Sequence, residues 1–588
     1  MANDDDPLLY RRPSSDQADQ QEEEDALLTG ERSPKYKSRG SKFWREIGLF
    51  SWALIATAAL IILAVVYQKQ KTDHKSGGHA PNGKRNLIMM ISDGMGPTSL
   101  AMARSYKQYQ YGLPWSERLV LDSHLIGSSR TRSTSSLVTD SAAGATAFSC
   151  GFKSYNGAIG VLPDHSPCGT VLEAAKSAGY MTGLVVTTRI TDATPACFAA
   201  HVNMRTEEDR IAEQLIGEYP LGLVVDLMLG AGRCHFLPNT TDGSCREDER
   251  DIIRSAKEKG FTYVHDRSGF DKLKFGTAVH LPLLGLFANQ DIPYEIDRRH
   301  QRDTYPSLDE MARTALTALS VATKNSDKGF FLMIEGSRID HAGHANDPAA
   351  HVHEVLAYDS AFASVLEFLE KDEVPGVMVS TSDHETGGLA VARQVHSAYP
   401  EYLWYPGVLA NVSHSAEYLS REYFDYHQAH PGKDMSPWIR EAVKKGLGIS
   451  DASDDEISLL ADHPEIALYT FTDMVSRRAQ TGWTTHGHSG ADVNIYASSP
   501  KDAKTLIGNH ENTEIGDFLQ SYLGVDVTPI TEELKEKGPM FDTMNQDGSS
   551  VSWMGRLPQE GERLDGQDHL DHYSGDFKKH KRCEICGL

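Results

Sequence analysis

Residues 330–381 read FFLMIEGSRIDHAGHANDPAAHVHEVLAYDSAFASVLEFLEKDEVPGVMVST, and this stretch decides the fold class. Two short apolar runs, Phe330–Ile334 and Val377–Thr381, are typical of buried strands. Between them, the apolar residues of 351–371 recur at helical spacing, which predicts an amphipathic helix. A strand, a helix and a second strand in this order indicate an α/β sandwich around a largely parallel sheet.

The same alternation extends in both directions from this stretch. Further strands are predicted at Asn86–Ser92, Gly183–Thr188 and Val493–Ala497. We therefore expect a three-layer α/β sandwich with a largely parallel central sheet over residues 85–540. Residues 389–482 break the alternation with an aromatic-rich segment, which is predicted to be an inserted subdomain.

Both ends of the chain differ in composition from this central part. Residues 1–46 begin with an acidic, Gln-rich stretch and are predicted to be a disordered tail. Residues 47–67 carry no charge over 21 positions, which matches the ~30 Å hydrocarbon core of a bilayer. Residues 68–84 are polar and are predicted to form a stalk, and residues 541–588 are predicted to be a polar C-terminal tail.

The charges beside residues 47–67 predict the orientation of this transmembrane helix. The basic residues that precede it are Arg32, Lys35, Lys37, Arg39, Lys42 and Arg45, and those that follow are Lys69, Lys71 and Lys75. Because basic residues accumulate on the cytosolic side, the N-terminus is expected in the cytosol and the rest of the chain across the membrane. This is a single-pass type II topology.

Short motifs agree with that topology. The sequons at Asn239 and Asn411 lie on the lumenal side, where they could be glycosylated. The cytosolic tail contains two acidic dileucine patterns, DDDPLL at 4–9 and EEDALL at 23–28. They resemble endosomal and vacuolar sorting signals that an adaptor could read. The alternative is an acidic tail that happens to contain paired leucines.

Composition excludes some classes of protein. The chain has 588 residues, of which 40% are hydrophobic, so a mostly disordered protein is excluded. The formal net charge of −24 argues against nucleic acid as the main partner, because neutralising phosphates requires a basic face. The seven cysteines are too few for a disulfide scaffold. In an oxidising compartment two pairs could close short loops, Cys150 with Cys168 and Cys234 with Cys245, while Cys583 and Cys586 are interpreted as a tail feature.

Two segments carry candidate chemistry at helix and strand ends. Asp93 follows the strand NLIMMIS and opens the turn DGMG. Ser141 lies in VTDSAAGATA, whose small residues let a helix begin at Ser141 while a large group approaches its first turn. Free amides there favour a phosphate. No histidine neighbours Ser141 in sequence, so a metal is indicated as its activator. In isolation, an ordinary turn at Asp93 and an N-cap at Asp140 or Ser141 remain alternatives.

Acids and histidines follow several predicted strands. They comprise Glu335, Asp340, His344, Asp383 and His384, and His486 and His488 precede a strand. Asp340 and His344 stand at i, i+4, a spacing suited to sharing a Zn²⁺. In an open α/β sheet the loops at the carboxyl ends of strands converge on the ligand. Carboxylates gathered there without metals would repel one another, so the pattern predicts a metal site.

Taken together, these motifs resemble the alkaline phosphatase family over roughly residues 84–525. TDSAAGATA is similar to the nucleophile motif of that family, and the membrane anchor with its dileucine tail is similar to the fungal vacuolar members. The resemblance implies hydrolysis of phosphate monoesters with broad specificity, through a phosphoserine on Ser141. It also implies a homodimer and trimming of the tail. The catalytic domain is then expected to face the lumen at the vacuolar membrane.

The resemblance further implies two Zn²⁺ ions and one Mg²⁺ ion. One Zn²⁺ would be held by Asp340, His344 and His488, and the other by Asp93, Asp383 and His384. The Mg²⁺ would be held by Asp93, Thr194 and Glu335, with Asp192 nearby. Arg205 falls at the position of the phosphate-clamping arginine, and His341, assigned to substrate binding, stands where some bacterial members have lysine. His488 is chosen over His486 because its spacing to Asp492 fits the family pattern.

Two other functions are compatible with parts of this pattern. A phosphodiesterase or sulfatase would usually carry Thr or a modified Cys as its nucleophile, and Ser141 with Arg205 argues against both. An inactive receptor on the same fold is disfavoured, since no metal or nucleophile position is lost. The sequence therefore predicts a metal-dependent phosphomonoesterase.

Overall fold

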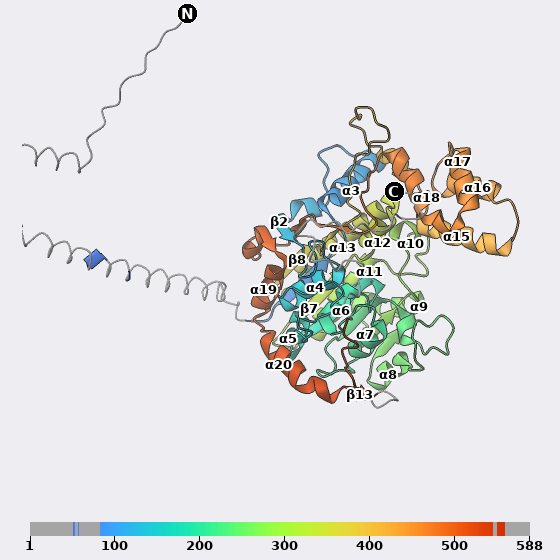
Figure 1. Cartoon of the computed structure of the whole chain (residues 1–588). Helices are drawn as coiled ribbons and strands as arrows, with labels where there is room; N and C mark the ends of the chain where they lie inside the picture. Colours follow the sequence, from blue (N-terminus) through green and yellow to red (C-terminus); the bar gives the residue numbers. More distant parts are fainter. Residues whose placement is uncertain (1–50, 53–56, 58–82, 545–549, 559–588) are drawn as a thin grey trace, which may run out of the picture. The chain divides into compact units, whose positions relative to one another are not determined.

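A ten-stranded sheet forms the centre of the protein (Figure 1). The structure is a computed structural model that describes residues 51–52, 57, 83–544 and 550–558. The strand order is β12-β2-β11-β8-β1-β7-β3-β4-β6-β5. The strands are β1 Asn86–Ile91, β2 Leu125–Arg130, β3 Met181–Arg189, β4 Leu227–Ala231, β5 Thr262–Val264, β6 Leu283–Leu286, β7 Phe330–Glu335, β8 Gly376–Thr381, β11 Val493–Ala497 and β12 Gly508–Glu511.

The sheet is parallel except at one strand. β11 runs antiparallel to both of its neighbours, β2 and β8, whereas the other paired strands run parallel. In the centre, Met89 of β1 pairs with Met333 of β7 on one side and Val379 of β8 on the other. All six residues of β1 are buried, as expected for a parallel strand covered on both faces.

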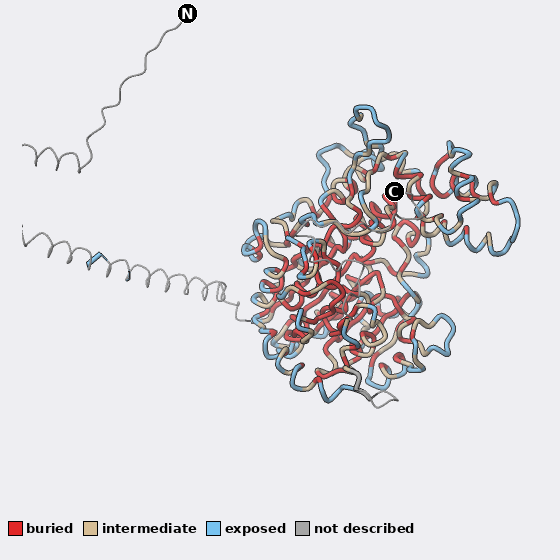
Figure 2. Tube along the Cα trace, in the orientation of Figure 1, coloured by how far each residue is buried: buried red, intermediate tan, exposed pale blue. Residues whose placement is uncertain are grey.

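Alternate residues of the central strands enter two different hydrophobic cores. Leu87 and Met89 belong to one cluster, and Ile88 and Met90 belong to the other. The first core is closed by helices α4 Ser141–Cys150, α5 Val171–Ser177, α6 Ala193–Ala199, α7 Glu208–Leu215, α8 Ile252–Glu258, α19 Asn512–Leu523 and α20 Thr528–Lys537. The second is closed mainly by α3 Pro97–Gln110, α9 Arg267–Lys272, α11 Leu308–Ala322 and α13 Pro348–Lys371. Figure 2 shows the buried residues running through the middle of this body. The predicted α/β sandwich with a largely parallel sheet is confirmed.

Five strands and one helix match the elements predicted from the sequence. They are β1, β3, β7, β8 and β11, with α13, which begins three residues before the predicted start at His351. Asp347 caps α13 by accepting from the amides of Ala349 and Ala350, and Pro348 occupies the first turn. Among the strands that were missed, β5 has only three residues and β2 has the mostly polar sequence LIGSSR.

Residues 390–482 leave the sheet and return to the same place. The two ends are joined by a bridge in which Ala390 and Gly482 exchange backbone hydrogen bonds of 2.8 Å. Between them lie α14 Pro406–Ala410, α15 Ala416–Ala429, α16 Ser436–Gly446, α17 Asp454–Asp462 and α18 Ala467–Ala479. These helices share a third hydrophobic cluster, which includes Leu419, Ile439 and Phe471 and extends to α12 Arg338–Ala345.

Several short elements complete the described part of the chain. They are α10 Glu295–Arg298, the two-residue pair β9 Glu385–Thr386 with β10 His488–Ser489, and the pair β13 Thr543–Met544 with β14 Ser550–Val551. Beyond β14, Trp553 is buried and its ring packs against those of His201 and Tyr219. This part of the predicted polar tail therefore contacts the domain.

The predicted membrane anchor cannot be compared with the structure. Residues 47–67 lie outside the described residues except for positions 51, 52 and 57, and so do the dileucine patterns, most of the stalk, Cys583 and Cys586. Among the described residues, none of the helices combines the length and the apolarity needed to cross a bilayer.

Candidate active site

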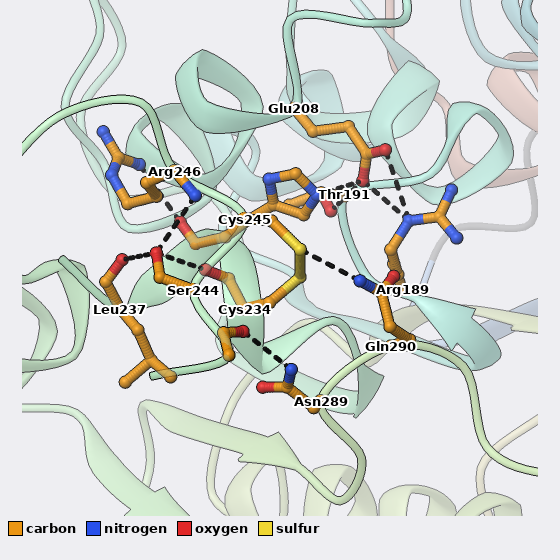
Figure 3. The surroundings of a disulfide bond; sticks show 12 residues. Arg189, Thr191, Glu208, Cys234, Leu237, Ser244, Cys245, Arg246, Asn289 and Gln290 are labelled. Atoms are coloured by element: carbon orange, nitrogen blue, oxygen red, sulfur yellow. Dashed lines mark hydrogen bonds and ion pairs between the residues drawn. A yellow bond between two sulfur atoms is a disulfide. The ribbon is translucent and has the colours of Figure 1, made fainter. Parts of the chain in front are cut away.

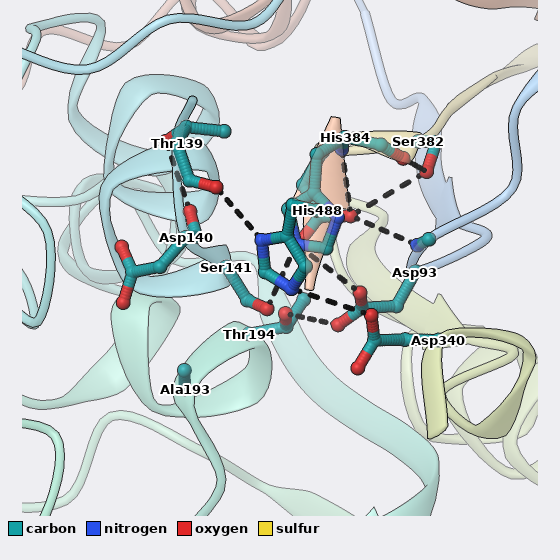
Figure 4. Close-up of polar contacts among 12 residues, drawn as sticks. Asp93, Thr139, Asp140, Ser141, Ala193, Thr194, Asp340, Ser382, His384 and His488 are labelled. Atoms are coloured by element: carbon teal, nitrogen blue, oxygen red, sulfur yellow. Dashed lines mark hydrogen bonds and ion pairs between the residues drawn. The ribbon is translucent and has the colours of Figure 1, made fainter. Parts of the chain in front are cut away.

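The candidate residues gather where the central strands end, around the N-terminus of α4 (Figure 4). Asp93 follows β1, Thr194 lies in the first turn of α6 after β3, and His384 follows β8. Glu335 ends β7 and Asp340 lies on α12, which follows it. Because β1, β3, β7 and β8 run parallel, their carboxyl ends share one edge, and residues separated by hundreds of positions meet there.

Ser141 is the first residue of α4. Asp140 caps the helix: one carboxylate oxygen accepts from the amide of Ala143 at 3.0 Å and the other from that of Gly157 at 2.9 Å. The Oγ of Ser141 lies 3.1 Å from Nε2 of His384. Gly144, one turn further on, permits this approach, because a Cβ there would lie 2.9 Å from the Cβ of Asp383. The sequence of small residues thus places a buried hydroxyl against the acid-rich loop after β8.

One group of acids lies beside Ser141 and is short of positive charge. Thr194 donates from Oγ1 to Oδ2 of Asp93 at 3.2 Å, and Nε2 of His384 lies 3.6 Å from Oδ1 of Asp93 and 3.3 Å from Oδ2 of Asp383. Burial and mutual repulsion raise the pKa values of Asp93 and Glu335 well above their ordinary range, and that of Asp383 to about 6.

Unpaired atoms in this group test whether a cation fits. Oδ1 of Asp93, Oε2 of Glu335 and Oδ2 of Asp383 are buried without a hydrogen-bond partner. Buried carboxylate oxygens are normally hydrogen-bonded or bound to a metal. Burial also lowers the pKa of His384 well below its ordinary value, so its imidazole is neutral, as a ligand must be. These donors fit divalent cations.

A second group consists of Asp340, His344 and His488. The Nε2 atoms of the two histidines lie 3.1 Å apart, with Oδ2 of Asp340 3.3 Å from His344 and Oδ1 3.5 Å from His488. Nδ1 of His488 lies 2.8 Å from the carbonyl oxygen of Thr139. Nδ1 of His344 contacts the carbonyl oxygen of His486. Since a carbonyl only accepts, both Nδ1 atoms donate. When neutral, the two Nε2 lone pairs then point at one place, an arrangement suited to Zn²⁺.

Charge couples the members of this second group. Burial would raise the pKa of Asp340, but His344 and His488 outweigh it and hold that pKa well below its ordinary value. Asp340 in turn raises the pKa of His344 to about 9. His384 connects the two groups, because its ring stacks on that of His488 with centroids 3.5 Å apart. His486 is outside the group: its Nδ1 lies 2.9 Å from the carbonyl of His344, and its ring packs on Tyr469.

Arg205 contacts the residue that caps α4. Its guanidinium donates to Oδ2 of Asp140 at 3.2 Å and to Oδ1 of Asp192 at 3.1 Å. A planar fork held in this way keeps further N–H groups in its plane that can donate to a phosphate. His341 is less directly placed: its Nδ1 accepts from Arg338 at 3.3 Å and lies 3.6 Å from Oδ2 of Asp291.

Some residues of this neighbourhood were not predicted from the sequence. Asp140 was considered only as a helix cap, although it also binds Arg205. Arg189 and Asp291 were not considered, yet they contact each other and Arg189 contacts Asp192. For Arg189 the only signal was its place at the end of a predicted strand, three residues before Asp192. Asp291 carried no signal, because its position depends on the path of the chain after β6.

The other predicted positions lie away from this site. Cys150 is joined to Cys168 in one disulfide. Cys234 is joined to Cys245 in a second (Figure 3). A ring nitrogen of His235 lies within 4.8 Å of the sulfurs of Cys234 and Cys245, but sulfurs that form a disulfide are not free to bind a metal. Both sequon asparagines, Asn239 and Asn411, are exposed.

Comparisons with known proteins identify the same family that the sequence motifs resemble. The sequence model of the family "Alkaline phosphatase" matches residues 84–525. The "Repressible alkaline phosphatase" of Saccharomyces cerevisiae is 52% identical over 516 residues, which cover 84% of this chain and 91% of that protein. The "Alkaline phosphatase" of Schizosaccharomyces pombe is 48% identical, covering 87% and 94%.

Solved structures agree with these sequence comparisons. A cold-active alkaline phosphatase from a psychrophilic Shewanella is 30% identical and superposes with a TM-score of 0.62, covering 74% of this chain and 99% of that one. The Thermus thermophilus alkaline phosphatase is 28% identical, with a TM-score of 0.64 and coverages of 78% and 96%. The family model over residues 84–525, the relatives at 52% and 48% identity and the fold shared with the solved structures show that the chain belongs to the alkaline phosphatase family and is a phosphatase.

Proposed function

We propose that the protein hydrolyses phosphate monoesters through a phosphoserine on Ser141, at a site for two Zn²⁺ ions and one Mg²⁺ ion. The observation that carries this proposal is the position of Ser141. Its Oγ lies at a helix N-terminus, beside His384 and next to carboxylates with unpaired buried oxygens. A bound cation explains these unpaired buried oxygens better than a purely structural role does.

The two groups of ligands support distinct metal assignments. Asp340, His344 and His488 would hold one Zn²⁺, and Asp93, Asp383 and His384 the other. Asp93, Thr194 and Glu335, with Asp192 nearby, would hold Mg²⁺. When bound, such ions supply Lewis acidity that favours the ionised form of a hydroxyl and stabilises charge on a departing oxygen.

The chain itself performs the remaining steps. Ser141 Oγ forms a bond to phosphorus while the bond to the substrate alcohol breaks, and water then releases phosphate from the serine. The free amides at the start of α4 favour the negative phosphate. Arg205, held by Asp140 and Asp192, binds two non-bridging oxygens. These groups contact the phosphate rather than the alcohol, which favours a broad range of monoesters. His341, next to Asp340 on α12, is assigned to substrate binding from the family resemblance.

The cellular location is part of the same proposal. The uncharged segment 47–67 and the basic residues before it favour a type II anchor, and the dileucine patterns favour an adaptor that delivers the protein to the vacuolar membrane. Two disulfides and two exposed sequons fit a catalytic domain on the lumenal side. Family resemblance also favours a homodimer.

A substrate comparison tests the proposed reaction. The detergent-solubilised full chain is assayed on a chromogenic phosphate monoester, a diester and a sulfate ester, with and without chelator. We expect fast hydrolysis of the monoester alone, loss of activity with chelator, and recovery with Zn²⁺ and Mg²⁺. Radiolabelled phosphate trapped at low pH should appear on Ser141. Faster turnover of the diester or the sulfate would contradict the proposal, as would activity that survives full metal removal.

A further inference from the structure

Arg189 lies at the end of β3, where its guanidinium meets three carboxylates from three different segments. Its Nη2 lies 3.2 Å from Oδ2 of Asp192, its Nε 2.9 Å from Oε2 of Glu208, and its Nη1 3.1 Å from Oδ1 of Asp291. Each guanidinium nitrogen of Arg189 therefore pairs with a different carboxylate. The side chains of all four residues are at most 20% exposed, so these ion pairs are only weakly screened by water.

Two of the three carboxylates fix Arg189 to the surrounding scaffold. Asp291 accepts from the backbone amide of Arg189 at 3.1 Å as well as from its guanidinium. Glu208, at the start of α7, also accepts from Oγ1 of Thr191 at 2.6 Å (Figure 3). His235, on the loop closed by the Cys234–Cys245 disulfide, lies 3.3 Å from the same oxygen of Glu208.

The backbone packs equally closely against Arg189. Gly232, just before His235, has a φ of +83°, and a Cβ there would lie 2.7 Å from the Cβ of Arg189 and 2.9 Å from its Cα. Only a glycine fits this conformation at this distance. Arg189 is thus immobilised by its backbone neighbours as well as by its ion pairs.

The third carboxylate, Asp192, connects this fixed arginine to the active site. Its Oδ2 faces Arg189, while its Oδ1 accepts from Nη2 of Arg205 at 3.1 Å. The amide of Ala193 also donates to Oδ1 of Asp192, at 2.7 Å. Arg189 therefore holds one carboxylate oxygen of Asp192, and the other is left for Arg205 and this amide.

We infer that Arg189 is a positioning residue for phosphate binding, because it holds Asp192 in the orientation that aligns Arg205. The inference rests on the proposed function, in which Arg205 binds phosphate. Without Arg189, Oδ2 of Asp192 would lose this partner, and the carboxylate, held only through Oδ1, would orient Arg205 less firmly before phosphate binds. A charged group that is ordered before binding binds more tightly than one that is ordered during it.

Arg189→Ala in the full-length enzyme tests this inference. We expect the KM for a chromogenic monoester and the inhibition constant of inorganic phosphate to rise by about 10- to 100-fold, with a smaller change in kcat. Added guanidinium ion should restore part of the affinity. Arg189→Lys should recover little, because an ammonium cannot serve three carboxylates in one plane. Arg210→Ala is the matched control, since Arg210 pairs with Glu207 at the surface of the same region, and its constants should stay within about twofold.

A double-mutant cycle separates this inference from the function on which it rests. If Arg205→Ala weakens phosphate inhibition and Arg189→Ala has no further effect on that background, Arg189 acts through Arg205. Additive effects overturn the inference, as does an unchanged inhibition constant in Arg189→Ala. An unchanged constant in Arg205→Ala would instead overturn the proposed role of Arg205, and the inference with it.

Folding and metal content need their own measurements. Zn and Mg per chain, determined by mass spectrometry, should be unchanged in Arg189→Ala, and a loss of metal that accounts for the lower affinity would overturn the inference. If this variant does not fold, Glu208→Gln replaces it, because it keeps the shape of the side chain and removes one anchor of Arg189. It should raise the phosphate inhibition constant in the same direction, and no rise would overturn the inference.

Discussion

Ser141 contributes little to the stability of α4, because Asp140 rather than Ser141 caps this helix. Ser141→Ala should therefore leave the fold intact and reduce turnover by ~10³-fold or more, because it removes the covalent intermediate. Steady-state kinetics and acid-quenched labelling with radioactive phosphate measure both effects. Ser149→Ala, on the last turn of the same helix, is the control. Near-normal turnover in Ser141→Ala, with no labelled serine in the parent enzyme, would refute the assignment.

Two histidines that are two residues apart have different surroundings, and this difference can be measured. His488 shares its Nε2 position with His344, whereas the ring of His486 packs on Tyr469. His488→Ala should lower the zinc content by about one ion per chain, while His486→Ala should lower it much less. Elemental analysis after dialysis against a fixed zinc buffer gives the comparison. The reverse order would show that His486 is the ligand.

At the scale of single helices, the close packing of α4 against the loop after β8 depends on Gly144. A Cβ at Gly144 would press against the Cβ of Asp383, in the loop that also carries His384. Gly144→Ala should displace α4 or this loop by several tenths of an ångström. A misplacement of ~1 Å can cost ~100-fold in rate, so we expect a loss of 10- to 100-fold in kcat/KM. Thermal unfolding measured beside the kinetics shows whether the loss is local. An unchanged rate would mean that the two elements adjust without cost.

Helix α13 carries a buried acid that makes the stability of the domain depend on pH. Burial raises the pKa of Glu354 to about 7, compared with 4.5 for an ordinary glutamate. The folded state then binds a proton that the unfolded state has released, so this stabilising effect is complete below pH 4.5 and is lost as pH rises through about 7. Full ionisation would cost on the order of 3 kcal/mol.

Glu354→Gln separates this effect from other causes. The variant should match the parent near pH 5 and unfold at a higher temperature near pH 8, because its side chain stays neutral. Calorimetry at both pH values measures the difference, and Glu536→Gln, at an exposed position, is the control. A variant that is equally destabilised at both pH values would show that the carboxyl is needed as a carboxyl.

A strand could be predicted from the sequence where its own residues form a recognisable apolar pattern. β1, β3, β7, β8 and β11 are short apolar runs, and burial on both faces of the sheet accounts for such runs. β2 pairs between β11 and β12, yet its sequence LIGSSR is mostly polar, so only its tertiary neighbours make it a strand. Likewise Ser141 and the proposed metal ligands were marked by motifs, whereas the link from Arg189 to Asp291 exists only because β6 and β3 end on the same edge.

At the scale of the whole molecule, the cytosolic tail is predicted to determine where the enzyme acts. Replacing Leu8, Leu9, Leu27 and Leu28 with Ala should misroute or delay the protein without changing its catalytic constants, because an adaptor would read only the tail. Cell fractionation with activity assays measures this. Delivery at the normal rate would show that the leucines are not the signal.

The predicted topology has a separate test. Protease added to intact vacuoles should trim only the tail before Ser41 and spare the phosphatase activity, since the catalytic domain is expected inside. Detergent added with the protease is the control, because it exposes the domain to cleavage at its loops. Loss of activity in intact vacuoles would place the domain in the cytosol.

The position of β1 in the sheet has a consequence for biosynthesis. β1 lies between β7 and β8, but on the ribosome these partners follow it by about 240 and 290 residues. At ~5–20 residues per second, the apolar sequence NLIMMI waits roughly 12 s or more with both edges unpaired. Unpaired apolar strands are sites of aggregation. The yield of this enzyme should therefore depend on chaperones that protect one strand during translation, more than on the stability of the finished domain.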